Sequence, residues 1–233
     1  MPVSGQKLSS GKLSSRRLKP APFVPSTFKT FEEIGVQLSY PAGTLLFEEG
    51  KPAEGIYLVR SGQIKLTATA VEGRSMILRI AQSGEVLGLS AILNRTVNEI
   101  TAKALTPCNL IHIDHDSFME FFEGTTNAGW HALLALARDH REVFQCARRL
   151  ALFPLASARI AQVLIGFAQT DPTAKPSSSF LMVLSHAELA SLVGTSRETV
   201  TRFLNELERK HIIARDDANV TILQFAKLEK LAR

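Results

Sequence analysis

The spacing of the apolar residues changes near Asp114, and this change divides the chain into two structurally different parts. Before it, short apolar runs alternate with glycines, as in Leu45–Phe47, Gly50 and Ile56–Val59. Short strands that recur about every 8–12 residues and are separated by turn residues are typical of a compact β-sandwich or β-roll. The pattern disfavours an α/β fold built with crossover helices.

After Asp114 the apolar residues follow a repeat of about 3.5 residues, which is typical of a long helix packed against another helix. The main stripe consists of Leu133, Leu136, His140, Val143, Ala147 and Leu150, and a second stripe of Trp130, Leu134, Ala137 and Phe144 lies beside it. One stripe can pack on the chain's own strands while the other packs on a second copy, so we expect a homodimer. Burial of both stripes within one chain is the alternative.

Two short helices separated by a glycine turn are predicted after residue 184. Ser185 and Glu188 have the spacing of a capping box that begins the first helix, and Thr195 and Glu198 have the spacing of a second one. Gly194 between them supplies the positive φ of the turn. The apolar positions at the helix crossing are Leu189, Ala190, Val193, Val200 and Phe203. This pattern predicts a helix-turn-helix.

The segments around this motif indicate a separate C-terminal domain. Phe153–Pro154 is a hinge or boundary, because proline disfavours helix for the residue before it. Residues 158–169 are predicted to form a helix, and 170–179 a loop. Residues 212–222 form two short strands around an Asp/Asn turn, the wing of a winged helix-turn-helix, from which Arg215 could reach a phosphate.

The start of the second helix of the motif is polar. Ser196, Arg197, Glu198, Thr201 and Arg202 lie where a recognition helix presents its side chains to base edges in the major groove. Arginine can bond guanine O6 and N7 together, and glutamate can accept from cytosine N4. A solvated helix face is the alternative interpretation of the same charges.

The charge balance agrees with a polyanionic partner. The net charge is +5 and the isoelectric point is near 9.4. Residues 1–20 carry five basic side chains and no acidic one, which accounts for the whole excess. Because this segment lacks apolar periodicity, we interpret residues 1–25 as a disordered basic tail that aids solubility or binds nucleic acid weakly.

Cysteine usage and hydropathy indicate a cytoplasmic protein. Cys108 and Cys146 are too few for a disulfide framework or a four-cysteine metal site. No uncharged run reaches the roughly 18 residues of a membrane-spanning helix, and the basic N-terminus lacks the apolar run of a signal peptide. We therefore expect no membrane partner.

The order of β-roll, long helix and winged helix-turn-helix resembles the Crp/Fnr superfamily of bacterial transcription regulators. The DNA-binding part of the resemblance is carried by Gly-Thr-Ser-Arg-Glu-Thr-Val-Thr-Arg at 194–202. The β-roll part is carried by Gly43, Gly50, Gly62, Gly84 and Gly88, which match the turns of the family's β-roll. The resemblance covers about residues 35–230.

The resemblance implies an α+β fold with three functional parts. These are an N-terminal β-roll like the jelly roll of cyclic-nucleotide-binding domains, a long dimerisation helix and a C-terminal winged helix-turn-helix. We assign the disordered tail to residues 1–25, the sensor β-roll to 26–124, the dimerisation helix and hinge to 125–152, and the DNA-binding domain to 153–233.

In the family's cyclic-AMP-responsive branch, the residues matching Arg197, Glu198 and Arg202 read a TGTGA-type half-site, and all three are present here. We therefore expect a TGTGA-like palindromic operator, with Thr201 as a fourth base-reading residue. The residues expected to contact phosphates are Ser185, His186, Thr195, Ser196 and Thr199. His186 stands where that branch usually has an arginine.

The effector cassette departs from the cyclic-nucleotide-binding pattern. Leu89 follows Gly88 where those binders have a glutamate for the ribose, and Asn98-Glu99-Ile100 stands where they have Arg-Ser-Ala. Leucine cannot accept a hydrogen bond, and Glu99 would repel a phosphate. The candidate pocket residues are Gly88, Leu89, Ser90, Arg95, Asn98 and Glu99. The cassette argues against cyclic AMP and cyclic GMP.

The cysteine and histidine residues bear on other sensing chemistries. An iron–sulfur cluster is not expected, because residues 1–107 contain no cysteine. Haem would need an axial ligand, for which the candidates are His112, His115, His131, His140 and Cys108. We expect no metal site, because His112 and His115 lack a third ligand at metal spacing. Cys108 and Cys146 are candidate thiol sensors or buried inert thiols.

The sequence thus predicts a homodimeric, sequence-specific DNA-binding regulator and no enzyme, since no nucleophile elbow, phosphate loop or metal motif is present. Its partners would be double-stranded DNA, a second copy and, for an activator, RNA polymerase. The β-roll would sense an unidentified effector or leave the protein constitutive. The alternatives are a cyclic-nucleotide-, haem- or thiol-based sensor, or a ligand-binding or interaction module that does not bind DNA.

Overall fold

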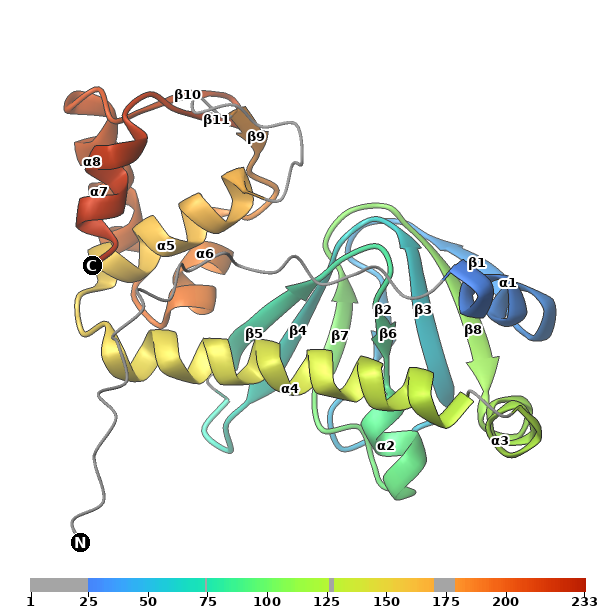
Figure 1. Ribbon diagram of the computed structural model, residues 1–233. Coiled ribbons are helices and arrows are strands. Elements are labelled where there is room, and N and C mark those ends of the chain that lie inside the picture. Colours follow the sequence, from blue (N-terminus) through green and yellow to red (C-terminus); the bar gives the residue numbers. More distant parts are fainter. Residues whose placement is uncertain (1–24, 74, 126–127, 170–178) are drawn as a thin grey trace, which may run out of the picture.

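The computed structural model describes residues 25–73, 75–125, 128–169 and 179–233. It shows the predicted α+β architecture, in which a β-roll is followed by a long helix and a small C-terminal domain (Figure 1). The predicted basic tail at 1–25 lies outside the described residues except for Pro25, and the predicted loop at 170–179 lies outside them except for Ser179.

The N-terminal domain consists of two antiparallel sheets with small helices at their edges. The first sheet has the order β1-β8-β3-β6 and the second the order β2-β7-β4-β5. The strands are β1 (Val36–Tyr40), β2 (Leu45–Phe47), β3 (Gly55–Ser61), β4 (Ile64–Thr69), β5 (Ser75–Ala81), β6 (Val86–Leu87), β7 (Thr101–Ala104) and β8 (Cys108–Asp114). The helices are α1 (Pro25–Ile34), α2 (Leu89–Asn94) and α3 (His115–Gly124). The β-roll expected from the glycine-punctuated runs is confirmed.

The core of the β-roll comes from the alternating apolar residues of these strands. Val59, Ile64 and Leu110 lie in one buried cluster, whereas Ile56 and Ile113 lie in another beneath the helices. Gly62 makes the tight turn between β3 and β4 at a φ of 92°. A Cβ atom there would lie 2.5 Å from the carbonyl oxygen of Pro107, so the turn requires glycine.

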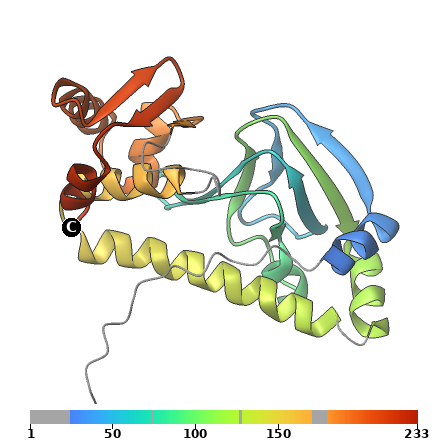
Figure 2. The same ribbon diagram turned by 45° about the horizontal axis from the view of Figure 1, so that its top comes forward.

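The predicted long helix is present as α4 (Ala128–Leu152), which runs from α3 along the β-roll to the C-terminal domain (Figures 1 and 2). Small residues let this helix approach the β-roll closely, since Ala128, Ala132 and Cys146 are its buried side chains. The helix therefore contacts both domains and is placed to couple them.

The two predicted apolar stripes of α4 have different outcomes along their length. Leu136 and Leu150 of the main stripe are half-buried against the chain itself. In contrast, Leu133 and Val143 are 54% and 51% exposed, and His140 and Ala147 are exposed as well. Of the second stripe, Trp130 and Phe144 are 60% and 56% exposed, and Leu134 is 40% exposed. The alternative in which one chain buries both stripes is wrong.

The C-terminal domain follows a short non-helical segment after Leu152, at the predicted hinge. It contains α5 (Ala156–Ala168), β9 (Ser179–Leu181), α6 (His186–Val193), α7 (Arg197–Arg209), β10 (Ile213–Asp216), β11 (Asn219–Ile222) and α8 (Phe225–Leu231). The strands form a small sheet in the order β10-β11-β9. The predicted wing is therefore confirmed, and α5 begins two residues before the predicted start at 158. None of the helices that the structure describes is long and apolar enough to cross a membrane.

Candidate nucleic-acid interface

The first helix of the predicted helix-turn-helix begins with the expected capping box. The Ser185 hydroxyl accepts a hydrogen bond from the backbone N–H of Glu188 at 3.2 Å, and the Glu188 carboxylate accepts from the Ser185 backbone N–H at 3.1 Å. Each side chain thus satisfies a backbone group that the helix start would leave unpaired. The capping pair fixes where α6 begins, and it therefore fixes the position of Ser185 at the N-terminus of the helix.

The turn between α6 and α7 also follows the prediction. Gly194 has a φ of 66°, and a Cβ atom there would lie 3.1 Å from Cδ2 of Leu150 on α4. The backbone N–H groups of Gly194 and Thr195 both donate to the carbonyl of Ala190, which closes α6.

The predicted second capping box is wrong by one residue. The N-cap of α7 is Ser196, whose hydroxyl accepts from the backbone N–H of Thr199 at 3.2 Å. The backbone N–H of Thr195, which a reciprocal capping box would bond to the Glu198 side chain, donates instead to the carbonyl of Ala190 at the end of α6. Thr195 and Glu198 therefore do not form the reciprocal pair expected from their spacing.

Apolar packing holds α6 and α7 in this arrangement. Leu189, Ala190, Val193, Val200 and Phe203 are all buried in one core, as predicted, together with residues of α5 and of the wing. Because the apolar side of α7 is used for this packing, its polar side faces solvent.

The exposed side of α7 carries the predicted base-reading residues. Arg197, Glu198, Thr201 and Arg202 line one open hollow, which is continued by Asn205, Glu206 and Arg209. Hydrogen bonds from its own backbone and from Ser196 hold the pKa of Glu198 below its ordinary value, so the carboxylate is an ionised acceptor at neutral pH. The arrangement offers cationic donors and an anionic acceptor along one helix face.

Sequence reasoning missed the three residues that extend this hollow. Asn205 and Arg209 are exposed and lie three and seven residues beyond Arg202, on the same side of the helix. Continuing the 3.6-residue spacing past the first two turns of α7 would have found them.

His186, the first residue of α6, contacts both the recognition helix and the wing. Its Nδ1 atom lies 2.8 Å from the Thr201 hydroxyl, and its Nε2 atom lies 3.2 Å from a guanidinium nitrogen of Arg215. Both ring nitrogens therefore have partners within the chain, in the place where a phosphate contact was predicted.

Arg215 is likewise held within the domain. Its guanidinium donates to Glu208 at 2.5 Å and to Asn205 at 2.8 Å, which joins β10 to α7. The hydrogen bond from Arg215 lowers the pKa of Glu208. Arg215 was predicted to extend toward a phosphate. In the structure its guanidinium is instead turned toward acceptors within the domain.

The hinge contains an arginine that sequence reasoning missed. The guanidinium of Arg159 donates to the carbonyls of Phe153 and Pro154 in the hinge at 2.7 and 3.0 Å. It also donates to the carbonyls of Val193 and Gly194 at 2.6 and 3.1 Å, at the turn of the helix-turn-helix. Arg159 thus ties the hinge to the turn that precedes α7. No local motif marks it, because its acceptors are all backbone atoms.

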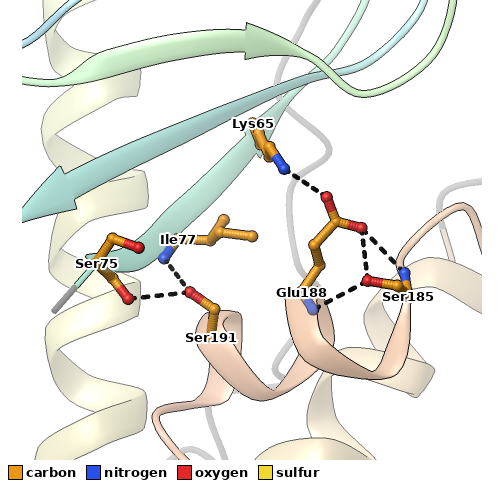
Figure 3. Close-up of polar contacts among 6 residues, drawn as sticks. All are labelled: Lys65, Ser75, Ile77, Ser185, Glu188 and Ser191. Carbon is orange, nitrogen blue, oxygen red and sulfur yellow. Dashed lines mark hydrogen bonds and ion pairs between the residues drawn. The ribbon is translucent and has the colours of Figure 1, made fainter. Parts of the chain in front are cut away.

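The C-terminal domain also contacts the β-roll through α6 (Figure 3). The Ser191 hydroxyl accepts from the backbone N–H of Ile77 at 3.0 Å and donates to the carbonyl of Ser75 at 3.3 Å, along the edge strand β5. The side chain of Ile77 joins the buried core of the C-terminal domain. The edge of the β-roll is thus covered by the first helix of the helix-turn-helix.

An ion pair lies beside this contact. The Lys65 ammonium on β4 donates to the Glu188 carboxylate at 2.5 Å, and the other oxygen of that carboxylate completes the capping box with Ser185 (Figure 3). Burial raises the pKa of Glu188, but the hydrogen bonds from Lys65 and Ser185 outweigh it and lower the pKa overall. One carboxylate therefore links the β-roll to the start of α6.

The residues of the predicted effector cassette are used mainly for folding. Leu89 is 5% exposed and packs in the apolar core of the β-roll. Asn98 is 4% exposed, and its amide donates to the carbonyls of Lys51 and Pro52 at 3.1 and 3.3 Å. Neither side chain is free to hold a ligand without repacking.

The other cassette residues lie around α2. Gly88 precedes the helix at a φ of 83°, and Arg95 ends it as an exposed residue at a φ of 53°. The Ser90 hydroxyl donates to the Glu99 carboxylate at 3.3 Å, so the structure brings these two cassette side chains together. A carboxylate at this point disfavours an anionic ligand.

An ion triad centred on the buried Arg79 connects the β-roll with α4. Arg79 on β5 is 9% exposed and forms ion pairs with Glu85 and with Asp139 of α4. Burial lowers the pKa of Arg79, but the two carboxylates outweigh it, so the group stays charged. The sequence could not reveal the contact with Asp139, because Arg79 and Asp139 lie 60 residues apart in the chain.

The two cysteines are buried. The Cys108 thiol donates to the backbone carbonyls of Gln63 and Thr106. Burial is the largest influence on its pKa and raises it. A raised pKa is the opposite of what an activated thiol needs.

The chain matches two domain families in succession. Residues 37–125 match the cyclic nucleotide-binding domain, and residues 158–231 match the Crp-like helix-turn-helix domain. The cyclic AMP receptor protein of Thermus thermophilus is 28% identical over 86% of this chain and 93% of its own length. A CRP-like cAMP-activated global transcriptional regulator of Mycobacterium tuberculosis is 26% identical over 90% of this chain and 93% of its own length.

Solved structures give the same relationship. The c-di-GMP-responsive global regulator CLP of Xanthomonas campestris superposes with a TM-score of 0.71 at 26% identity, over 84% of this chain and 98% of its own. The fold alone is shared with FixK2 of Bradyrhizobium japonicum, at a TM-score of 0.76 and 19% identity over 86% of this chain and 98% of its own.

The β-roll, the long helix and the exposed face of α7 together define a DNA-binding transcription regulator of the winged helix-turn-helix class. With both domain families matched in this order, the chain belongs to the Crp/Fnr family of transcription regulators. The relatives named above are regulators rather than enzymes.

Proposed function

We propose that the protein is a homodimeric regulator that reads a TGTGA-like palindrome with α7. The observation that carries this proposal is the exposed face of α7, where Arg197, Glu198, Thr201 and Arg202 line one hollow. Arginine and glutamate side chains on a recognition helix match the donor and acceptor pattern of G·C pairs in the major groove. On this proposal the site contacts base edges as well as the DNA phosphate backbone.

The backbone contacts of this proposal come from the helix starts. Ser185, Ser196 and Thr199 lie at the N-termini of α6 and α7, where backbone N–H groups and the helix dipole favour phosphate. Thr195 lies in the turn between them. We assign His186 a different role, because both of its ring nitrogens have partners within the domain.

Selection of binding sites from random duplex DNA tests the proposal. Purified protein with no added small molecule should enrich a palindrome with TGTGA-like half-sites about one helical turn apart, roughly 34 Å between centres. Failure of folded dimer to enrich any sequence would contradict effector-independent reading of DNA.

The same protein offers a test against an interaction module that does not bind DNA. Binding through phosphates weakens steeply with salt because counterions are released, whereas an apolar protein interface does not show this dependence. We expect the logarithm of the association constant to fall linearly with the logarithm of the salt concentration. A flat response would favour the interaction module.

The homodimer is supported by the exposed apolar face of α4. Trp130, Leu133, Val143 and Phe144 are each at least half exposed in the single chain, and a parallel α4 of a second copy would cover them. Two recognition helices related by a twofold axis would then match a palindrome.

Lysine substitutions test this interface. Leu133→Lys with Val143→Lys should give a monomer by sedimentation velocity, with loss of palindrome binding. Val71→Lys is the matched control, since Val71 is fully exposed but lies outside α4 and should leave the dimer intact. A dimer that survives the α4 substitutions would overturn the assignment of this face.

We propose further that the β-roll responds to an effector other than cyclic AMP or cyclic GMP, or that the protein is constitutive. The burial of Leu89 and Asn98 supports this, as does the carboxylate of Glu99 where a phosphate partner is needed. The relatives differ among themselves in the same respect, because one is named for cyclic AMP and another for c-di-GMP. Calorimetric titration with cyclic AMP and cyclic GMP should show no binding, and micromolar binding of either would contradict the proposal.

Coupling between the β-roll and DNA would pass through three contacts of the C-terminal domain. These are the β5 contact of Ser191, the Lys65–Glu188 pair and the hinge hydrogen bonds of Arg159. An effector that shifts β5 or α4 would change the orientation of α6 and α7 through them. A cytoplasmic location, and contact with RNA polymerase for an activator, belong to the same proposal.

A further inference from the structure

His186 lies at the junction of three elements of the DNA-reading domain. It is the first residue of α6, and its two ring nitrogens face Thr201 on the recognition helix and Arg215 on the wing strand β10. The ring is half-buried between these elements. A single side chain therefore joins the helix that reads bases to the wing.

The direction of each hydrogen bond in this chain follows from its chemistry. A guanidinium can only donate, so Arg215 must donate to Nε2 of His186, which then carries no proton. A neutral imidazole with Nε2 unprotonated carries its proton on Nδ1, which donates to the Thr201 hydroxyl. That hydroxyl donates in turn to the backbone carbonyl of Arg197 at 3.0 Å.

We infer that His186 is a positioning residue for DNA reading, held as the neutral Nδ1–H tautomer, that fixes the Thr201 side chain and links it to Arg215. This inference rests on the proposed base-reading role of α7. This hydrogen-bond relay, from Arg215 through His186 to Thr201, sets the rotamer of Thr201. Only the methyl group and one hydroxyl lone pair of Thr201 are then left to face a base. It also assigns His186 a role inside the domain in place of a phosphate contact.

The surroundings of the ring favour the neutral form. Burial, then the charge of Arg215 on β10, then that of Arg197 on α7 lower the pKa of His186 below its ordinary value of 6.5. The Glu208 carboxylate of α7 is bonded to the other terminal nitrogen of Arg215, and the groups that shift the pKa of the ring include no carboxylate. The relay is therefore intact at neutral pH.

Protonation of His186 would break the relay at its Arg215 end, because Nε2 would become a donor facing a donor. A cationic ring would at the same time attract phosphates, which raises the affinity for every DNA sequence and cancels in a ratio of affinities. The measured quantity must therefore be the ratio of affinities for the operator and for a scrambled duplex. We expect this ratio to be constant above about pH 7 and to fall as the pH drops below the ordinary histidine value.

Two substitutions separate the ends of the relay. In His186→Asn the amide nitrogen lies near the position of Nδ1 and can donate to Thr201, but the side chain is too short to reach Arg215. In His186→Gln the amide oxygen lies near the position of Nε2 and can accept from Arg215, but nothing donates to Thr201. Both variants keep a polar amide, and thermal unfolding of each checks that the domain is folded.

The test combines a spectroscopic and a binding measurement on the full chain. Imidazole ¹⁵N NMR at neutral pH should show the Nδ1–H tautomer for His186. The operator-to-scrambled affinity ratio should fall about two- to tenfold in His186→Gln, the range of one neutral hydrogen bond, with a flat pH profile. His186→Asn should recover most of that loss.

The outcomes distinguish this inference from the proposed function. A dominant Nε2–H tautomer, or a protonated ring at neutral pH, overturns the relay. Equal ratios in the wild type and His186→Gln, or equal losses in both variants, overturn the positioning of Thr201. If the tautomer is as inferred but no sequence is ever selected from random DNA, the proposed function fails while the hydrogen-bond relay stands.

Discussion

The recognition helix α7 and the segment around α2 both carry motifs of the family, but the residues at their key positions have different surroundings. Arg197, Glu198 and Arg202 of α7 are exposed on one helix face, whereas Leu89 and Asn98 of the cassette are buried in the fold. On α7 the apolar half packs inward and leaves the polar half for a ligand. Around α2, Leu89 and Asn98 of the predicted effector cassette are used for apolar packing and for hydrogen bonds to backbone carbonyls.

This difference shows where a motif is sufficient to predict a site. An exposed helix face depends on local spacing, which the sequence contains directly. A pocket depends on which side chains the surrounding sheets leave free, and that is a property of the tertiary packing.

Arg159→Met tests how far the recognition side depends on a residue outside its motif. The substitution removes four hydrogen bonds to hinge and turn carbonyls, and should lower the free energy of unfolding by about 3 kcal/mol. Urea denaturation measures the change, with Arg148→Met on the exposed side of α4 as control. A change no larger than in the control would mean that Arg159 does not hold the hinge to the turn.

Arg197→Ala and Arg95→Ala compare an exposed arginine from each region. Loss of a base contact at Arg197 should weaken operator binding by about 1–3 kcal/mol and relax specificity at one base pair. Arg95, at the end of α2, should have no effect on operator binding. Fluorescence anisotropy with operator and scrambled duplexes gives both values. Equal weakening on all sequences would assign Arg197 to phosphate contact instead.

Asn98→Ala tests the structural role of the cassette. The buried amide donates to two carbonyls, so its loss should lower the free energy of unfolding by about 1–2 kcal/mol while operator reading is unchanged. Asn94→Ala, on the exposed side of α2, is the control. Unchanged stability of Asn98→Ala would show that the amide is available for another purpose.

Lys65→Met should have the smallest effect. Its ion pair with Glu188 is partly exposed, and its loss should lower the free energy of unfolding by less than about 1 kcal/mol, compared with Lys103→Met on β7.

The pH dependence of this pair has a definite sign. Because the pKa of Glu188 is lowered in the folded protein, its contribution is complete above the ordinary glutamate value of 4.5 and is lost as the pH falls through the lowered value. The difference between wild type and Lys65→Met should therefore shrink in acid. A difference that grows as the pH falls would contradict the assignment.

Much of the fold could be predicted from the sequence. Glycine turns, the 3.5-residue repeat and the Ser185–Glu188 capping box gave the β-roll, α4 and the start of α6. The start of α7 was displaced by one residue, because the sequence does not show that the N–H of Thr195 still closes α6.

The parts that could not be predicted share a physical reason. Arg159 bonds to backbone carbonyls, Arg79 pairs with Asp139 on the distant helix α4, and His186 and Arg215 turn inward toward each other. Each of these side chains has a partner that only the tertiary structure brings near. Local spacing identifies which residues are polar and exposed, but not which acceptor a long side chain chooses.

The central claim is that Arg197 reads a base of the operator, and a cycle of protein and DNA substitutions tests it most directly. Operator affinity would be measured for wild type and Arg197→Ala, each with the selected duplex and with duplexes changed at one base pair at a time. If Arg197 reads a base, the loss of affinity caused by Arg197→Ala disappears when one G·C pair of the half-site is changed, and it persists when any other pair is changed. A loss of the same size on every duplex would contradict base reading by α7.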